Sequence, residues 1–251
     1  MKGVGSQVWA LRTMGRLTAA DRFALMGQGL RVQARRLLRR FRAADIPIDI
    51  DLEAVTAPDT QAARQAALLC QEVSPPYLLN HCYRTYLWGH VFAKVRSISF
   101  DNELLFVAAL LHDLGLTKAY AGCAEHAECF SLDSVQGAGA LARQVAWSRE
   151  RQDTLAEAIV MHLNIVVPLR CGAEAHLLHA GAAMDVVGMD AETIGEATRG
   201  AVVQQYPRED FKKAFGERLR AEMEERPGGR ICYLHRRLGF GRLIRQAPFS
   251  E

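Results

Sequence analysis

The 251-residue sequence has none of the long apolar runs of membrane proteins and none of the biased composition of fibrous or low-complexity proteins, and its first residues do not resemble a secretory signal. No stretch approaches the ~18 consecutive apolar residues of a membrane span, so we expect no such span. With 20 Gly and 8 Pro, the chain is neither collagen-like nor a low-complexity linker. Residues 1–23 carry scattered charges and no continuous apolar segment before a cleavage site, and we therefore expect a cytoplasmic protein.

Cysteine pairs with the spacing of metal or redox motifs are also absent. The cysteines form no C-x-x-C pair, and a chain of this length can bury a core without disulfides. We therefore expect reduced thiols. The six positions are Cys70, Cys82, Cys123, Cys129, Cys171 and Cys232.

Three common nucleotide and hydrolase motifs are missing as well. The sequence contains no G-x-G-x-x-G, G-x-x-x-x-G-K-[ST] or G-x-S-x-G, and gives no support for dinucleotide, P-loop or serine-hydrolase chemistry. No segment alternates cleanly between apolar and polar residues, whereas apolar residues recur every three or four positions. This pattern predicts an all-α fold. The expected helices cover residues 21–41, 59–72, 76–97, 102–113, 132–147, 151–163, 173–187 and 208–225.

The N-terminal segment is strongly basic. Ten Lys or Arg against two Asp give residues 1–45 a charge of +8, so the rest of a chain of net charge +3 carries −5. The spacing of its apolar residues predicts an amphipathic helix. Its basic face could bind an anionic partner or a membrane surface, but we favour the interpretation that this face is exposed to water. Pro47 and Pro58 suggest a connection, and we expect residues 1–50 to be an extension of a domain at 51–251. The apolar stripe comprises Met26, Leu30, Ala34, Leu37, Leu38 and Phe41, and the basic face Arg31, Arg35, Arg39 and Arg42.

An unusual group of polar residues interrupts three apolar helices. His112 and Asp113 end the apolar helix at 102–113, where a carboxylate is costly unless a cation or strong donors compensate it. His81 and Asp185 lie in two further helices of low charge. Two imidazoles and two carboxylates could hold one divalent cation such as zinc, iron or manganese. Taken singly, His81 could be a hydrogen-bonded core residue and Asp185 a helix cap.

In order and spacing, these four residues resemble the H…HD…D signature of the HD superfamily of metal-dependent hydrolases. Within that superfamily, the sequence most resembles the cyanamide hydratase-like branch, over roughly residues 57–245. This resemblance implies an all-helical HD bundle with one divalent transition metal, most often zinc, held by His81, His112, Asp113 and Asp185. The segments that carry it are NHCYRTYLWG (80–89), LLHDLGLT (110–117), FSLDSVQGA (130–138), EAIVMHLN (157–164) and AGAAMDVVG (180–188).

Two further positions correspond to metal-binding histidines of the binuclear enzymes of this superfamily, and the first of them departs from that pattern. Asp133 stands where those enzymes have a histidine, and His162 lies on the following helix. The resemblance therefore implies a single metal. It also implies that Asp133 and His162 move protons or contact the substrate, with Asp113 as a further proton acceptor.

The function that we expect is metal-assisted addition of water to a small molecule, such as a nitrile-like carbon in the conversion of cyanamide to urea. One alternative is hydrolysis of a phosphate ester, with Arg84 and Lys118 as anion contacts. Another is a non-catalytic HD-like module that binds through the basic helix. We expect no nucleic-acid partner, and the pattern leaves a homo-oligomer open.

Overall fold

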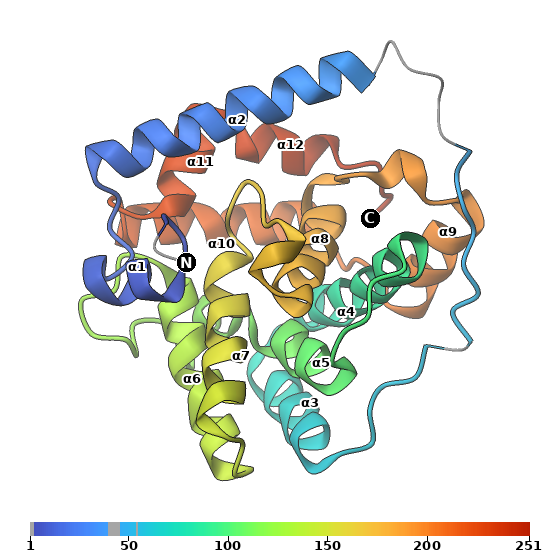
Figure 1. Ribbon diagram of the computed structural model, residues 1–251, viewed down its shortest axis with the longest axis horizontal. Coiled ribbons are helices and arrows are strands. Elements are labelled where there is room, and N and C mark those ends of the chain that lie inside the picture. Colours follow the sequence, from blue (N-terminus) through green and yellow to red (C-terminus); the bar gives the residue numbers. More distant parts are fainter. Residues whose placement is uncertain (1–2, 40–45, 54) are drawn as a thin grey trace.

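The computed structural model describes residues 3–39, 46–53 and 55–251 (Figure 1). Within these ranges the chain forms α-helices, three short 3-10 helices and no strand, which confirms the all-α prediction. The helices are α1 (Gln7–Thr13), α2 (Ala19–Arg39), α3 (Gln61–Val73), α4 (Pro76–Arg96), α5 (Asn102–Leu111), α6 (Phe130–Gln144), α7 (Arg149–Met161), α8 (Ala173–Val187), α9 (Glu196–Gln205), α10 (Phe211–Glu225), α11 (Arg230–Leu238) and α12 (Phe240–Gln246).

The predicted helices correspond to α2–α8 and α10, with ends that differ by a few residues. α10 begins at Phe211 rather than at 208, because Glu209 and Asp210 adopt positive φ angles of 55°. The sequence pattern missed α1, α9, α11 and α12. None of the helices in the described part of the chain is both long and apolar enough to cross a bilayer. No disulfide joins any two of the six cysteines, all of which lie in the described residues.

The centre of the molecule is a close contact between α4 and α8 (Figure 1). Most of both helices is buried, and α5 beside them buries eight consecutive residues, 104–111. A β-carbon on Gly181 of α8 would lie 2.2 Å from the Thr85 carbonyl oxygen of α4. Glycine therefore allows the two backbones to touch, and this contact fixes where side chains of α4 and α8 meet.

The N-terminal helices pack against the rest of the chain. Trp9, Leu17 and Leu25 form a buried cluster with Leu132 of α6 and Val160 of α7. The domain boundary near residue 50 stays a prediction. Among the described residues, side chains from both sides of this boundary share one buried cluster.

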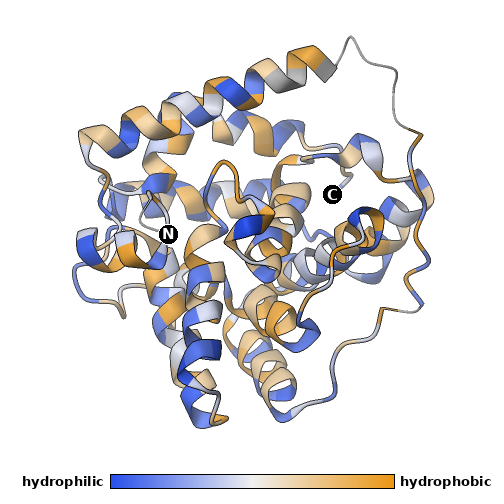
Figure 2. Cartoon of the chain, viewed as in Figure 1, coloured by the Kyte–Doolittle hydropathy of each residue, from blue (hydrophilic) through white to orange (hydrophobic). Residues whose placement is uncertain are grey.

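Helix α2 exposes the apolar stripe that its sequence pattern would bury. Leu25 and Gly29 face the protein, whereas Met26 and Leu30 are 43% and 65% exposed. Leu37 and Leu38 are also exposed, and Figure 2 shows hydrophobic residues along α2. Arg31 is solvated, as expected. The side chains of Arg35 and Arg39, and the residues Phe41 and Arg42, lie outside what the structure describes.

Replacing Gly181 by Ala tests the α4–α8 contact. We expect Gly181→Ala to lower the free energy of unfolding by about 1–3 kcal/mol, because the new methyl group must push the α4 backbone away. Gly200→Ala in α9 is the control, since nothing lies within 4 Å of its added β-carbon. It should be neutral or raise stability by up to about 1 kcal/mol. Equal effects in urea denaturation would contradict the close packing.

Candidate metal centre

The end of α5 turns sharply and brings His112 and Asp113 to one site. α5 ends at Leu111, and a 3-10 helix at Leu114–Leu116 follows directly. A β-carbon on Gly115 would lie 2.1 Å from the Phe130 carbonyl oxygen. Only glycine lets this turn pass so close to α6, and the turn directs His112 and Asp113 toward α4.

Three ligand atoms form a nearly equilateral triangle. His81 Nε2 lies 3.3 Å from His112 Nε2 and 3.5 Å from Asp113 Oδ2, and the third side, from His112 Nε2 to Asp113 Oδ2, is 3.4 Å. We call this arrangement the ligand triangle. All three side chains are at most 3% exposed. A tetrahedral shell about 2.0–2.2 Å from Zn²⁺ has edges of about 3.3–3.6 Å, so the triangle fits one face of such a shell.

Hydrogen bonds at Nδ1 leave Nε2 of each imidazole free to act as a ligand. His81 Nδ1 donates to Asp185 Oδ2 at 2.7 Å, and His112 Nδ1 donates to the Ala109 carbonyl oxygen at 2.7 Å. These acceptors fix the tautomer, with the lone pair on Nε2. Orientation by a carboxylate or carbonyl on the far nitrogen is typical of metal-binding histidines. The donor set therefore fits a divalent cation.

Asp185, the fourth predicted ligand, lies on the other side of His81. Its carboxylate accepts from His81 Nδ1, from Arg84 at 2.7 and 3.0 Å, and from Trp88 Nε1 and Arg208 at 3.2 Å. The structure thus brings three of the four predicted ligands together. The contacts of Asp185 indicate that it orients His81, and its direct ligation of a metal stays a prediction.

Arg84 is fully buried and fully engaged. Besides its two bonds to Asp185, it donates to the carbonyl oxygens of Tyr206 and Pro207. It does not line the cavity described below. The predicted contact between Arg84 and a substrate gains no support from this geometry, which shows a countercharge for Asp185.

His162 lies beside the ligand triangle. Its Nδ1 donates to the Ile159 carbonyl oxygen, and its Nε2 faces Asp113 Oδ1 at 3.6 Å. The rings of His112 and His162 are 4.8 Å apart. This position agrees with a residue that contacts substrate or moves a proton, which stays a prediction.

Asp133 lies apart from the ligand triangle. Its carboxylate accepts hydrogen bonds from the backbone N–H groups of Gly122 and Ala124. It also accepts one from Arg226, which lies between α10 and α11. Both oxygens therefore hold the 122–124 loop, and Asp133 does not line the cavity. Its predicted role in proton transfer is not supported by these contacts, which indicate a structural role.

Burial and neighbouring groups set the charges of the site. Burial opposes ionisation of Asp113, but His112 and then His81 and His162 lower the pKa of its carboxyl far below the ordinary value. Burial lowers the pKa of His112 and, together with His112, that of His162. At His81 burial favours the neutral form, yet Asp113 and Asp185 raise the pKa overall. A cation at His81 Nε2 would therefore compete with a proton.

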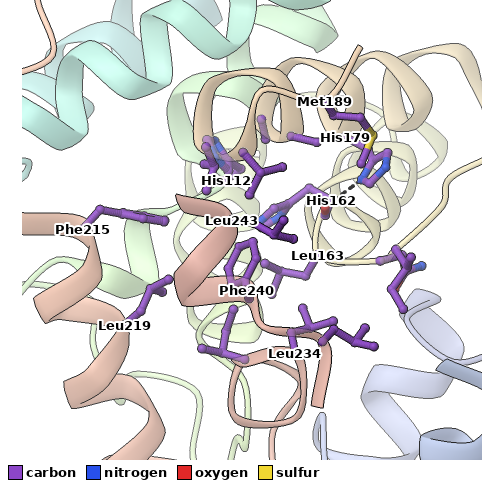
Figure 3. Close-up of a pocket in the computed structure, with 18 of the residues that line it drawn as sticks. His112, His162, Leu163, His179, Met189, Phe215, Leu219, Leu234, Phe240 and Leu243 are labelled. Atoms are coloured by element: carbon purple, nitrogen blue, oxygen red, sulfur yellow. Dashed lines mark hydrogen bonds between the residues drawn. The ribbon is translucent and has the colours of Figure 1, made fainter. Parts of the chain in front are cut away.

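A cavity of about 160 Å³ adjoins the ligand triangle (Figure 3). His81, His112, Asp113 and His162 form part of its wall, and apolar side chains from α2, α8, α10, α11 and α12 form most of the rest. Among the described residues that line it, none is Lys or Arg. His179 also lines the cavity and donates from Nδ1 to the His162 carbonyl oxygen at 3.0 Å. The sequence gives His179 no predicted role, because it matches none of the ligand positions that the resemblance implies.

Comparisons with known proteins find distant relatives that are enzymes. No family model matches the chain. Two proteins of Saccharomyces cerevisiae (strain ATCC 204508 / S288c), cyanamide hydratase DDI2 and cyanamide hydratase DDI3, are each 22% identical to it over 188 residues. The similarity covers 72% of this chain and 80% of each yeast protein. This distant homology to an enzyme supports a hydratase or hydrolase.

Substitution of Asp185 distinguishes an orienting carboxylate from a ligand. Asp185→Asn should weaken zinc affinity about 10–100-fold, as expected for the loss of a partner behind a ligating His. His112→Ala should abolish specific binding. Asp185→Asn should also lower the free energy of unfolding by about 3 kcal/mol, because buried Arg84 loses its countercharge and buried Arg208 keeps only Glu251. Zinc titration and urea denaturation measure the two effects. Zinc loss as complete as in a folded His112→Ala would instead make Asp185 a ligand.

Substitution of both partners of the Asp133–Arg226 pair tests the structural role. Asp133→Asn and Arg226→Met should each lower the free energy of unfolding by about 1–3 kcal/mol, because the first leaves Arg226 only Glu222 as a countercharge and the second leaves the buried Asp133 carboxylate with backbone N–H donors alone. Metal content should stay at the parental value in both. The matched control is Arg149→Met, since Arg149 and Asp153 form an exposed pair. A large loss of turnover in Asp133→Asn alone would restore the catalytic role.

Proposed function

We propose that the protein is a metal-dependent hydratase or hydrolase that adds water to a neutral, nitrile-type carbon. The observation that carries this proposal is the ligand triangle in the wall of a cavity whose described lining contains no cationic side chain. His81, His112 and Asp113 would hold one divalent cation, with zinc preferred and iron or manganese compatible with the same donors. The distant yeast relatives, which are cyanamide hydratases, support the same class of reaction.

Held by His81, His112 and Asp113, a divalent cation would supply Lewis acidity, which acidifies water and polarises an electrophile. The protein supplies the proton-accepting groups. Asp113 Oδ2 is part of the ligand triangle, whereas its Oδ1 faces His162 Nε2. Because burial keeps His162 neutral, its Nε2 can accept a proton and return it to the nitrogen of the product.

The cavity favours a neutral substrate over a phosphate ester. An anionic substrate would need cationic partners, since burial of an unpaired charge is costly. Arg84 is committed to Asp185 and backbone carbonyls, and Lys118 is exposed and does not line the cavity. The phosphohydrolase alternative therefore lacks its anion contacts. A purely binding role is also disfavoured, because it offers no reason for a buried His–His–Asp group.

A metal-by-substrate matrix tests the proposal. The metal-stripped protein, reconstituted with zinc, iron or manganese, should form urea from cyanamide with at least one metal and release no phosphate from nucleotides. Asp113→Ala should lose both metal and turnover, since it removes a ligand and a proton acceptor. The control is Asp153→Ala on the exposed face of α7, which should match the parent. Phosphate release without urea formation would contradict the proposal.

A further inference from the structure

The cavity is larger and more apolar than a molecule such as cyanamide requires. Cyanamide has three non-hydrogen atoms and is polar throughout. A cavity of about 150 Å³ lined by Leu, Ile and Phe holds benzene in an engineered protein, and the volume here is about 160 Å³. The space therefore suits an apolar group of about six carbons next to the ligand triangle.

The wall of the cavity separates into a polar and an apolar part. The polar groups are mainly the imidazoles and the carboxylate around the triangle, and the others are Gln33 of α2 and Asn164, which follows α7. Asn164 is already engaged, since its Oδ1 accepts from Arg230. Figure 3 shows side chains of α10, α11 and α12 around the same cavity as His112 and His162. The labelled ones among them are Phe215, Leu219, Leu234, Phe240 and Leu243.

Helix α2 completes this apolar part. Gly29 and Val32 line the cavity, and a β-carbon on Gly29 would lie 2.9 Å from a methyl carbon of Leu238 in α11. Helix α2 therefore packs closely on α11 and forms one wall of the cavity. The expected extension is thus part of the binding site.

From this geometry we infer that the cavity binds the apolar substituent of the substrate, so that the substrate is a neutral nitrile or N-substituted cyanamide with a group of about six carbons. The inference rests on the proposed function. Water adds across the C≡N bond: a carbon–oxygen bond forms, two hydrogens end on nitrogen, and the product is an amide or an N-substituted urea. No oxidant, reductant or leaving group is needed.

Binding of product analogues tests the cavity independently of turnover. Methyl-, propyl-, hexyl- and decylurea are titrated calorimetrically into the full chain. We expect the Kd to fall about fourfold per methylene up to about six carbons, as for burial of apolar surface, and then to level off. A Kd independent of chain length would overturn the inference.

Two variants locate the binding. Val32→Trp on α2 adds a large side chain to the lining of the cavity and should remove the gain between propyl- and hexylurea. Ala183→Phe on α8, which also lines the cavity, should do the same. Val8→Trp is the matched control, because Val8 is 58% exposed on α1 and does not line the cavity. An undiminished gain in both folded cavity variants would overturn the inference.

Turnover by the protein loaded in turn with zinc, iron and manganese separates this inference from the proposed function. N-hexylcyanamide should have a kcat/KM at least tenfold above that of cyanamide. Turnover of cyanamide with no preference for the hexyl compound would overturn the inference and leave the hydratase intact. Length-dependent binding without turnover of either compound would contradict the hydratase and leave the apolar binding site standing.

Discussion

The buried carboxylate of Asp185 is the constraint on which the candidate centre depends. It accepts hydrogen bonds from His81, Arg84 and Trp88 of α4 and from Arg208, which follows α9. A carboxylate and two guanidinium groups in the core are tolerated only when each is paired. The network therefore fixes α8 against α4, and the same contact directs His81 Nε2 toward the end of α5. Small residues at the α4–α8 interface make this approach sterically allowed.

The second constraint is the turn after α5. An apolar helix that ends in His112-Asp113 and a nearby glycine can be read from the sequence, because the cost of burying a carboxylate marks the pair as unusual. The position of Asp185 could not be read in the same way. A ligand and a residue that orients a ligand both produce a lone acid in an apolar helix, and only the packing of α8 shows which face of His81 it meets. Asp133 illustrates the same limit, since its partners come from the 122–124 loop and Arg226.

The helical class followed from the periodicity, whereas the cavity did not. Its apolar part depends on α11 and α12, which the sequence analysis missed and which are too short, at 9 and 7 residues, to repeat an apolar pattern more than a few times. The apolar residues Ile231, Leu234 and Leu238 recur at helical spacing and would have been the available signal. For α2 the periodicity predicted a helix but not its orientation, since the face that meets the protein carries Leu25 and glycine rather than the longer apolar stripe.

X-ray absorption at the zinc edge tests the central claim most directly. If His81, His112 and Asp113 hold one cation, the zinc-loaded protein should contain about one ion per chain. The spectrum should show nitrogen and oxygen neighbours at about 2.0–2.2 Å, imidazole multiple scattering and no sulfur. The specific signal should vanish in His112→Ala. A sulfur shell from cysteine ligands, or an unchanged spectrum in a folded His112→Ala protein, would contradict the account.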